Sequence, residues 1–178
     1  PNVFGCSLLM EEIFREAGFP RDLFRSLLID IPLTTEVIRN PLVAAVTITS
    51  SVNAGRAVAS EAGKVLKKCV LELGGSDAFI VLEDADVDKA VEIGIIGRYQ
   101  NSGQSCIAAK RFIVVDAVYD EFEKKFVDAV KQLKMGDPSA EDIYVGPQAR
   151  VDLRDGLHDQ VQRSVDAGAK CLVGGQVP

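Results

Sequence analysis

Two short segments of the sequence contain residues that could carry out covalent chemistry. Cys106 lies among small and polar residues in the stretch GQSCIAAKR (103–111), and Glu72 precedes a leucine and a Gly-Gly pair. A cysteine thiolate on an accessible turn can act as a nucleophile. A carboxylate on a separate segment can activate water as a general base. The two residues are 34 positions apart, which predicts a covalent mechanism that divides the two tasks between them.

These segments resemble the catalytic signatures of the NAD(P)-dependent aldehyde dehydrogenases. The resemblance extends over the chain, from EIFREAGFP (12–20) to the Gly-Gly pair at 174–175. The stretches GGSDAFIVLEDADVD (74–88) and GRYQNSGQSCIAAKRFIV (97–114) are most similar to the bacterial succinate-semialdehyde dehydrogenase branch of the family. The resemblance implies oxidation of an aldehyde, with succinate semialdehyde as the expected substrate, to its carboxylate. The cofactor is expected to be NAD or NADP, and the sequence leaves that choice open.

The resemblance also assigns a role to each of the two residues. Cys106 is expected to attack the aldehyde carbon and form a thiohemiacetal, which gives hydride to nicotinamide and leaves a thioester. Its backbone N–H is expected to help bind the oxyanion, together with an asparagine that the family supplies from upstream of Pro1. Glu72 is expected to deprotonate the water that hydrolyses the thioester. Without the resemblance, a lone cysteine is more often a small buried residue, and a glutamate at a strand end is more often a solvated charge.

A second group of residues is expected to bind the cofactor. The segment 49–51 lies where a predicted strand meets a predicted helix, so the helix N-terminal amides and the Ser51 hydroxyl could bind a pyrophosphate. A solvated helix cap is the alternative interpretation. Ser50 stands where the family normally has glycine, which leaves the local backbone conformation and the cofactor affinity open. Within the resemblance, Leu73 contributes a backbone carbonyl near the nicotinamide, and Gly74 allows the cofactor to approach the backbone closely.

Composition and charge argue against several classes of protein. The chain has 178 residues, of which 47% are apolar and 26% charged, as is usual for a soluble globular protein of one domain or slightly more. A net charge of -6 argues against a nucleic-acid partner. The longest apolar run, residues 42–48, is too short to cross a bilayer. No signal peptide is visible, so we expect a cytoplasmic protein with a small-molecule aldehyde substrate and no membrane partner.

Residues that could bind metals or form disulfides are few and scattered. Four cysteines could form two disulfides in a secreted protein, but free thiols are expected in a cytosolic one. The cysteines are Cys6, Cys69, Cys106 and Cys171. His158 is the only histidine and is expected to be exposed, so a metal site of cysteine and histidine is poorly supported. The acidic residues at 84, 86 and 88 lack the glycine and glutamate of a calcium loop and are expected to cap a helix.

The elements that must hold these residues alternate between strand and helix. Helices are predicted over 3–17, 33–39, 52–66, 86–101, 118–134 and 151–167. Strands are predicted over 23–29, 42–49, 69–73, 78–82, 111–115 and 171–173. Thr34 or Thr35 is the expected cap of the second helix. Phe122 and Phe126 are expected in the core. Fully apolar strands that alternate with helices predict an α/β fold with a parallel sheet covered on both faces.

The pattern restarts after residue 73, which predicts a domain boundary. The resemblance identifies 1–73 as the C-terminal part of a Rossmann-type nucleotide-binding domain and 74–178 as the N-terminal part of an α/β catalytic domain. Family members are more than twice this long, so we expect a fragment that is inactive alone, from an enzyme that is a homo-oligomer at full length. Two alternatives stay open: a relative that passes the acyl group to coenzyme A or phosphate, and a non-enzymatic structural homologue. Retention of Glu72 argues against the first alternative, and retention of both Cys106 and Glu72 argues against the second.

Overall fold

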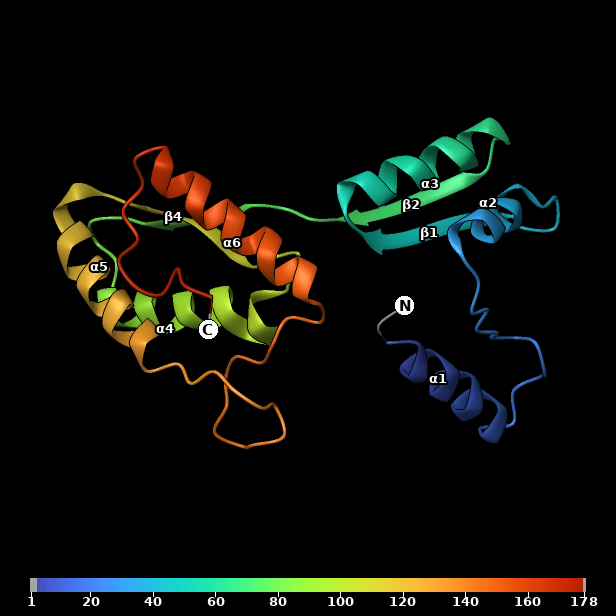
Figure 1. The fold of residues 1–178 in the computed structure, drawn as a ribbon, viewed down its shortest axis with the longest axis horizontal. Coiled ribbons are helices and arrows are strands. Elements are labelled where there is room, and N and C mark those ends of the chain that lie inside the picture. The colour runs from blue at the N-terminus through green and yellow to red at the C-terminus, as the bar shows by residue number, and fades with distance from the viewer. Residues whose placement is uncertain (1–2, 178) are drawn as a thin grey trace. The chain divides into compact units, whose positions relative to one another are not determined.

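Two pairs of parallel strands organise the computed structural model, which describes residues 3–177 (Figure 1). One pair lies in the compact unit Pro1–Leu73 and the other in the unit Gly74–Pro178. In each pair a helix connects the two strands, because a parallel neighbour can be reached only by a crossover. The predicted α/β fold with parallel strands is confirmed.

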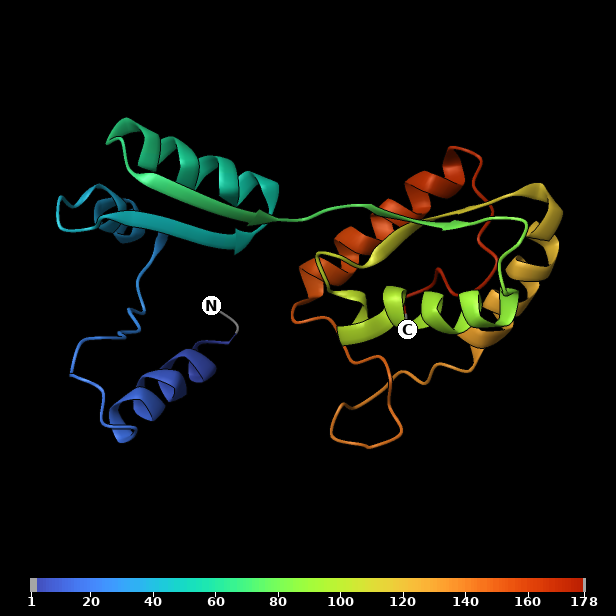
Figure 2. The same cartoon turned by 180° about the vertical axis from the view of Figure 1, so that it is seen from behind.

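The first unit contains three helices and two strands. In chain order these are α1 (Phe4–Glu16), α2 (Ile31–Arg39), β1 (Ala45–Ser50), α3 (Val52–Lys64) and β2 (Lys68–Leu73). The two strands are in register from the pair Ala45–Lys68 to the pair Ser50–Leu73, without a bulge. Their carboxyl ends therefore lie at the same edge of the sheet. Both views of the ribbon show α3 running along this strand pair (Figures 1 and 2).

The packing of α3 on the sheet depends on Gly55. This residue is buried, and a Cβ atom built on it would lie 2.6 Å from a methyl carbon of Leu73. Such a contact is too short for any side chain, so the glycine allows the helix to approach the end of β2 closely. The contact holds the side chain of Leu73 on the face of the sheet that α3 covers.

The second unit contains the other strand pair, a short 3₁₀ helix and three helices. These are β3 (Asp77–Val81), α4 (Val87–Tyr99), the 3₁₀ helix η1 (Gln100–Gly103), β4 (Ala109–Val114), α5 (Asp116–Lys131) and α6 (Val151–Asp166). The helix α4 begins at Asp86, whose carboxylate accepts a hydrogen bond of 3.1 Å from the backbone N–H of Lys89. The prediction that Asp86 caps a helix is confirmed.

Aromatic rings on α5 and the strands form the core of this unit. Phe122 is buried and Phe126 packs against the buried cluster, so their predicted place in the core is confirmed. The rings of Phe112 and Phe126 lie 4.8 Å apart between centroids. Such tilted ring pairs add a directional interaction to the burial of apolar surface. The core fixes α4 and α5 against β3 and β4, and thereby the ends of the segment that carries Cys106.

Two of the predicted strands are absent from the described residues. Residues 23–29 and 171–173 are apolar, but no other segment pairs with them, and they follow irregular paths. Leu23, Leu27 and Leu28 are largely exposed. A run of apolar residues becomes a strand only where a neighbouring strand satisfies its backbone hydrogen bonds. The prediction of these two strands was wrong for that reason.

The cap of α2 also differs from the prediction. Asp30, rather than Thr34 or Thr35, caps the helix and accepts a hydrogen bond of 3.0 Å from the backbone N–H of Leu33. The threonine hydroxyls instead donate to backbone carbonyls one turn earlier. The Thr34 hydroxyl, for example, donates to the carbonyl of Asp30. The helix therefore starts two residues earlier than expected, with a proline in its first turn, where the missing N–H costs nothing.

The second sheet exposes a pair of isoleucines, and the first sheet exposes a single valine on a largely polar face. Ile80 and Ile113, which are paired across β3 and β4, are 62% and 49% exposed, and Val70 on β2 is 50% exposed. We expected helices on both faces, but within residues 3–177 α3 covers one face of the first sheet, and α4 and α5 pack with the second. Among the described residues, no helix is long and apolar enough to span a membrane.

Candidate active site

Glu72 and the predicted cofactor residues meet at the carboxyl edge of the first sheet. Thr49 pairs with Glu72 and Ser50 with Leu73, so the ends of β1 and β2 are adjacent. Because side chains alternate across a strand, Glu72 faces away from α3, whereas Leu73 packs against it. Glu72 is exposed, and the structure gives its carboxylate no hydrogen bond or ion pair within residues 3–177. Its two oxygens are therefore open to solvent at the edge of the sheet.

Ser51 occupies the start of α3, where its hydroxyl oxygen accepts a hydrogen bond of 3.3 Å from the backbone N–H of Ala54. Ser50 is the last residue of β1 and is exposed. The structure thus places both serines at the strand–helix junction, with the first amides of α3 at the carboxyl edge. Open parallel sheets bind ligands at this edge, and helix N-termini favour anions. The residues present therefore fit a dinucleotide phosphate, although the observed hydrogen bond of Ser51 is that of a helix cap.

Cys106 lies in an irregular segment before β4, here called the Cys106 loop (residues 103–108), which begins with the last residue of η1. Residues 105–108 form a turn, in which the N–H of Ala108 donates to the carbonyl of Ser105 over 3.1 Å. Cys106 is exposed, whereas Ala108 is fully buried. The structure therefore presents the thiol at the surface of the second unit, on a turn before a strand, as the sequence predicted.

The backbone that leads into the Cys106 loop is left-handed at three consecutive residues. The φ angles of Asn101, Ser102 and Gly103 are 51°, 56° and 74°. This conformation is costly for serine in particular. Hydrogen bonds compensate: the N–H of Gln104 donates to the carbonyl of Asn101 over 3.1 Å, and the N–H of Gly146 donates to the Ser102 hydroxyl over 2.9 Å. The predicted helix over 86–101 ends at Tyr99 because of this reversal.

Cationic side chains bind the carbonyls of the Cys106 loop. The Lys110 ammonium donates to the carbonyls of Ser105, Cys106 and Ala108 over 3.2, 3.1 and 3.2 Å. The Arg98 guanidinium donates to the carbonyl of Gly103 over 3.3 Å. We did not anticipate these contacts, because a lysine at the start of a strand has no distinctive spacing. Only the path of the backbone shows that three carbonyls converge on it.

The Gly-Gly segment lies beside the Cys106 loop in the second unit. A Cβ atom on Gly75 would lie 3.4 Å from the carbonyl oxygen of Cys106, so the backbone of this glycine lies within van der Waals reach of the loop. The guanidinium of Arg111 donates to the carbonyl of Ser76 over 2.9 Å. The structure thus brings the residues after Gly74 into contact with the loop that carries the thiol. Gly74 itself is exposed and has open space around it.

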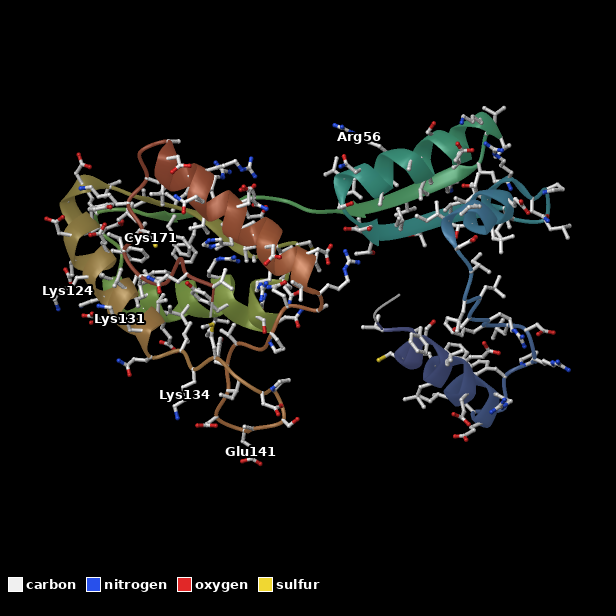
Figure 3. All side chains as sticks on the ribbon, viewed as in Figure 1. Arg56, Lys124, Lys131, Lys134, Glu141 and Cys171 are labelled. Atoms are coloured by element: carbon white, nitrogen blue, oxygen red, sulfur yellow. The ribbon has the colours of Figure 1, made fainter. Side chains whose placement is uncertain are left out.

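The other cysteines and the histidine lie outside this arrangement. The four cysteines form no disulfide in the structure of residues 3–177. Cys6 and Cys171 are exposed, and Figure 3 shows Cys171 in the segment after α6. His158 is partly buried on α6, where we expected an exposed side chain. Within residues 3–177 no group of three or more potential metal-binding side chains is found.

Comparison with known proteins identifies the family. Residues 2–178 match the family described as "Aldehyde dehydrogenase family". The chain belongs to this family. The aldehyde dehydrogenase chain is 50% identical, over 99% of its length, to the succinate semialdehyde dehydrogenase [NAD(P)+] Sad of Escherichia coli K12. It is 47% identical, over 99% of its length, to the succinate-semialdehyde dehydrogenase [NADP(+)] of Mycobacterium leprae.

Solved structures show the same fold in this family. Succinic semialdehyde dehydrogenase from Streptococcus pyogenes, in complex with NADP+ as the cofactor, superimposes with a TM-score of 0.93 at 37% identity over 97% of this chain and 38% of that one. The structure of Gox0499 gives a TM-score of 0.94 at 40% identity over 97% of this chain and 38% of that chain. The aldehyde dehydrogenase chain spans 38% and 39% of the length of the E. coli and M. leprae relatives.

Proposed function

We propose that the protein carrying this chain oxidises succinate semialdehyde to succinate with NADP+ or NAD+, through a covalent thioester on Cys106. The observation that carries the mechanism is the exposed thiol on a turn whose backbone is held by Lys110 and Arg98. The relatives named as succinate-semialdehyde dehydrogenases, at 45–50% identity, support the substrate. Both NAD(P)+ and NADP+ occur in their names.

In the proposed reaction the Cys106 thiolate adds to the aldehyde carbon and gives a tetrahedral thiohemiacetal. The backbone N–H of Cys106 donates to the oxygen that becomes negative, which stabilises the charge as it develops. Nicotinamide, when bound, supplies the acceptor for the hydride that leaves this carbon. Glu72 then takes a proton from the water that attacks the thioester, and the thiolate of Cys106 is released with the carboxylate product.

The two units have different tasks in this proposal. Residues 1–73 form part of the nucleotide-binding domain, in which Ser50, Ser51 and Leu73 meet at the carboxyl edge of a parallel sheet. Residues 74–178 form part of the catalytic domain and carry Cys106. The exposed Glu72 supports hydrolysis over transfer of the acyl group to coenzyme A or phosphate, which needs no base for water. We further propose that the protein is a cytoplasmic homo-oligomer, and its four free thiols fit a reducing compartment.

The substitution Cys106→Ala tests the mechanism. We expect it to lower the rate of aldehyde oxidation in the whole protein by at least about 10³-fold, because no other group can form the thioester. The matched control is Cys171→Ala, which removes another exposed cysteine of the same unit and should leave the rate unchanged. The measurement is NAD(P)H formation with succinate semialdehyde. Turnover of the Cys106→Ala variant within tenfold of the parent would show that Cys106 is not the nucleophile.

A further inference from the structure

We propose that Lys110 is a positioning residue that sets the direction of the Cys106 backbone N–H. The inference rests on the proposed function, in which this N–H binds the oxyanion. Neither the family match nor the names of the relatives assign a role to this lysine. It contributes no atom to the reaction itself, and it acts through the peptide groups of the Cys106 loop.

The contacts of Lys110 account for all the donors of its ammonium group. A lysine ammonium has three N–H donors and no acceptor. Three carbonyl oxygens lie 3.1–3.2 Å from Nζ, those of Ser105, Cys106 and Ala108. Hydrogen bonds from a charged donor are stronger than neutral ones. Four peptide groups connect residues 105 to 109. The ammonium group of Lys110 therefore binds the carbonyl oxygens of three of them.

The backbone of Lys110 is itself fixed. It is the extra residue of a bulge in β4, and its two neighbours Ala109 and Arg111 pair with the consecutive residues Asp77 and Ala78 of β3. Ala108 and Ala109 are both buried. The ammonium thus reaches back over the loop from an element whose position the sheet determines. A lysine on a mobile segment could follow the loop, whereas this one holds it in place.

The geometry of a trans peptide connects these carbonyls to the oxyanion donor. The carbonyl of Ser105 and the N–H of Cys106 belong to the same planar peptide group and point in opposite directions. When Lys110 holds the carbonyl, it also directs the Cys106 N–H away from the ammonium and toward the outside of the turn. A donor that already points at the developing charge has no reorganisation cost during the reaction.

The turn in the loop does not fix this orientation alone. The N–H of Ala108 also donates to the Ser105 carbonyl, but the structure gives the Cys106 carbonyl no hydrogen bond within residues 3–177 other than that from Lys110. Without the ammonium, this carbonyl would turn toward water, and the Ser105–Cys106 peptide that carries the donor N–H would keep only the turn hydrogen bond from Ala108. The expected loss is therefore in transition-state binding more than in the binding of aldehyde.

The test compares Lys110→Met with Lys110→Arg in the whole protein. Methionine keeps an apolar stem without donors, and arginine keeps a charged donor that can reach the same carbonyls. We expect Lys110→Met to lower kcat about 10- to 100-fold, since one misdirected oxyanion donor costs up to about 10²–10³, with KM within about threefold of the parent. Lys110→Arg should restore kcat to within about fivefold. Lys110→Gln replaces Lys110→Met if the latter does not fold.

Lys67→Met is the matched control. Lys67 also donates to two backbone carbonyls, those of Ile38 and Asn40, but in the first unit. The Lys67→Met variant should have a lower melting temperature than the parent, without a comparable loss of kcat. The proposal is overturned if Lys110→Met keeps kcat within twofold of the parent, if Lys110→Arg is as impaired as Lys110→Met, or if Lys67→Met lowers kcat equally. A parent protein that oxidises no aldehyde would instead refute the proposed function.

Discussion

The two proposed catalytic residues differ in how their surroundings constrain them. The backbone around Cys106 is fixed by the left-handed run at 101–103 and by the contacts of Lys110. Glu72 is the residue before the last one of a regular strand, and its exposed carboxylate has no partner among the described residues. A nucleophile held by its loop and a base without a bound partner suit the proposed reaction in two steps, because the base is needed only after hydride transfer.

Glu72→Gln separates these steps. We expect the first turnover, measured as a burst of NAD(P)H, to survive with nearly full amplitude. Steady-state turnover should fall by about 10²–10⁴-fold, the usual contribution of a general base. The measurement is stopped-flow absorbance with the whole protein and succinate semialdehyde, and Glu83→Gln is a control at an acid after β3 that has no proposed role. If burst and steady state fall together, Glu72 acts before hydride transfer, for instance on the thiol.

At the scale of elements, the parallel strand pairs gather residues that are distant in sequence. The register of β1 with β2 makes Ser50 and Leu73 neighbours although they are 23 positions apart in the sequence. The crossover helix α3 must pack closely enough to keep both strand ends in place. Gly55 is the residue that permits this, since its missing side chain leaves room for Leu73.

Gly55→Val should therefore disturb both stability and the cofactor edge. Its Cβ would collide with the Leu73 methyls, and overpacking of this kind typically costs about 1–3 kcal/mol. The control is Gly63→Ala on the same helix, where nothing lies within 4 Å of the added carbon and where the substitution should stabilise by about 0.5–1 kcal/mol. Urea unfolding measures both effects. We also expect Gly55→Val alone to raise KM for the cofactor.

Local patterns in the sequence predicted the helices and four of the strands, because the residues within each of these elements carry the pattern that defines it. The apolar spacing of Phe122 and Phe126, for example, is enough to define the buried face of α5. The strands at 23–29 and 171–173 required a pairing partner, which no local pattern reveals. The contacts of Lys110 depended on the path of a turn. Pairing and turn geometry are tertiary properties, so they were found only in the structure.

For the candidate site, the sequence located Cys106 on its turn and the serines at the start of a helix. Both follow from residue types at element boundaries, where glycine, asparagine and serine are frequent. The left-handed conformation of Ser102 was not foreseeable, because serine seldom adopts it. It depends on the N–H of Gly146, which lies 44 residues later. The assignment of catalytic roles rests on the resemblance, and these roles remain predictions.

At the scale of the whole molecule, the exposed faces of the two sheets predict behaviour in solution. Ile80 and Ile113 form an exposed apolar pair on one sheet, and Val70 is exposed on the other. Contiguous exposed apolar surface favours association. The chain spans 38% of the length of the E. coli relative, and holding reactants in a reactive geometry requires contacts on all sides of a cleft.

Residues 1–178, purified alone, should therefore associate and show no aldehyde oxidation. Size-exclusion chromatography with light scattering measures association, and NAD(P)H formation measures activity with NAD and then NADP. Ile80→Lys combined with Ile113→Lys is the informative variant, because it should reduce association without restoring activity. A monomeric parent chain, or turnover close to that of the whole protein, would show that these residues are self-sufficient.

The contact between Gly55 and Leu73 also limits how the length of the chain can vary. One residue inserted into or deleted from α3 would rotate the rest of the helix by about 100° about its axis. An insertion between Ser51 and Gly55 would turn the glycine away from the strand and bring a larger side chain toward it. The turn at 65–67 carries no such constraint on helix phase. Length changes between homologues should therefore be tolerated at that turn and be rare in the first turns of α3.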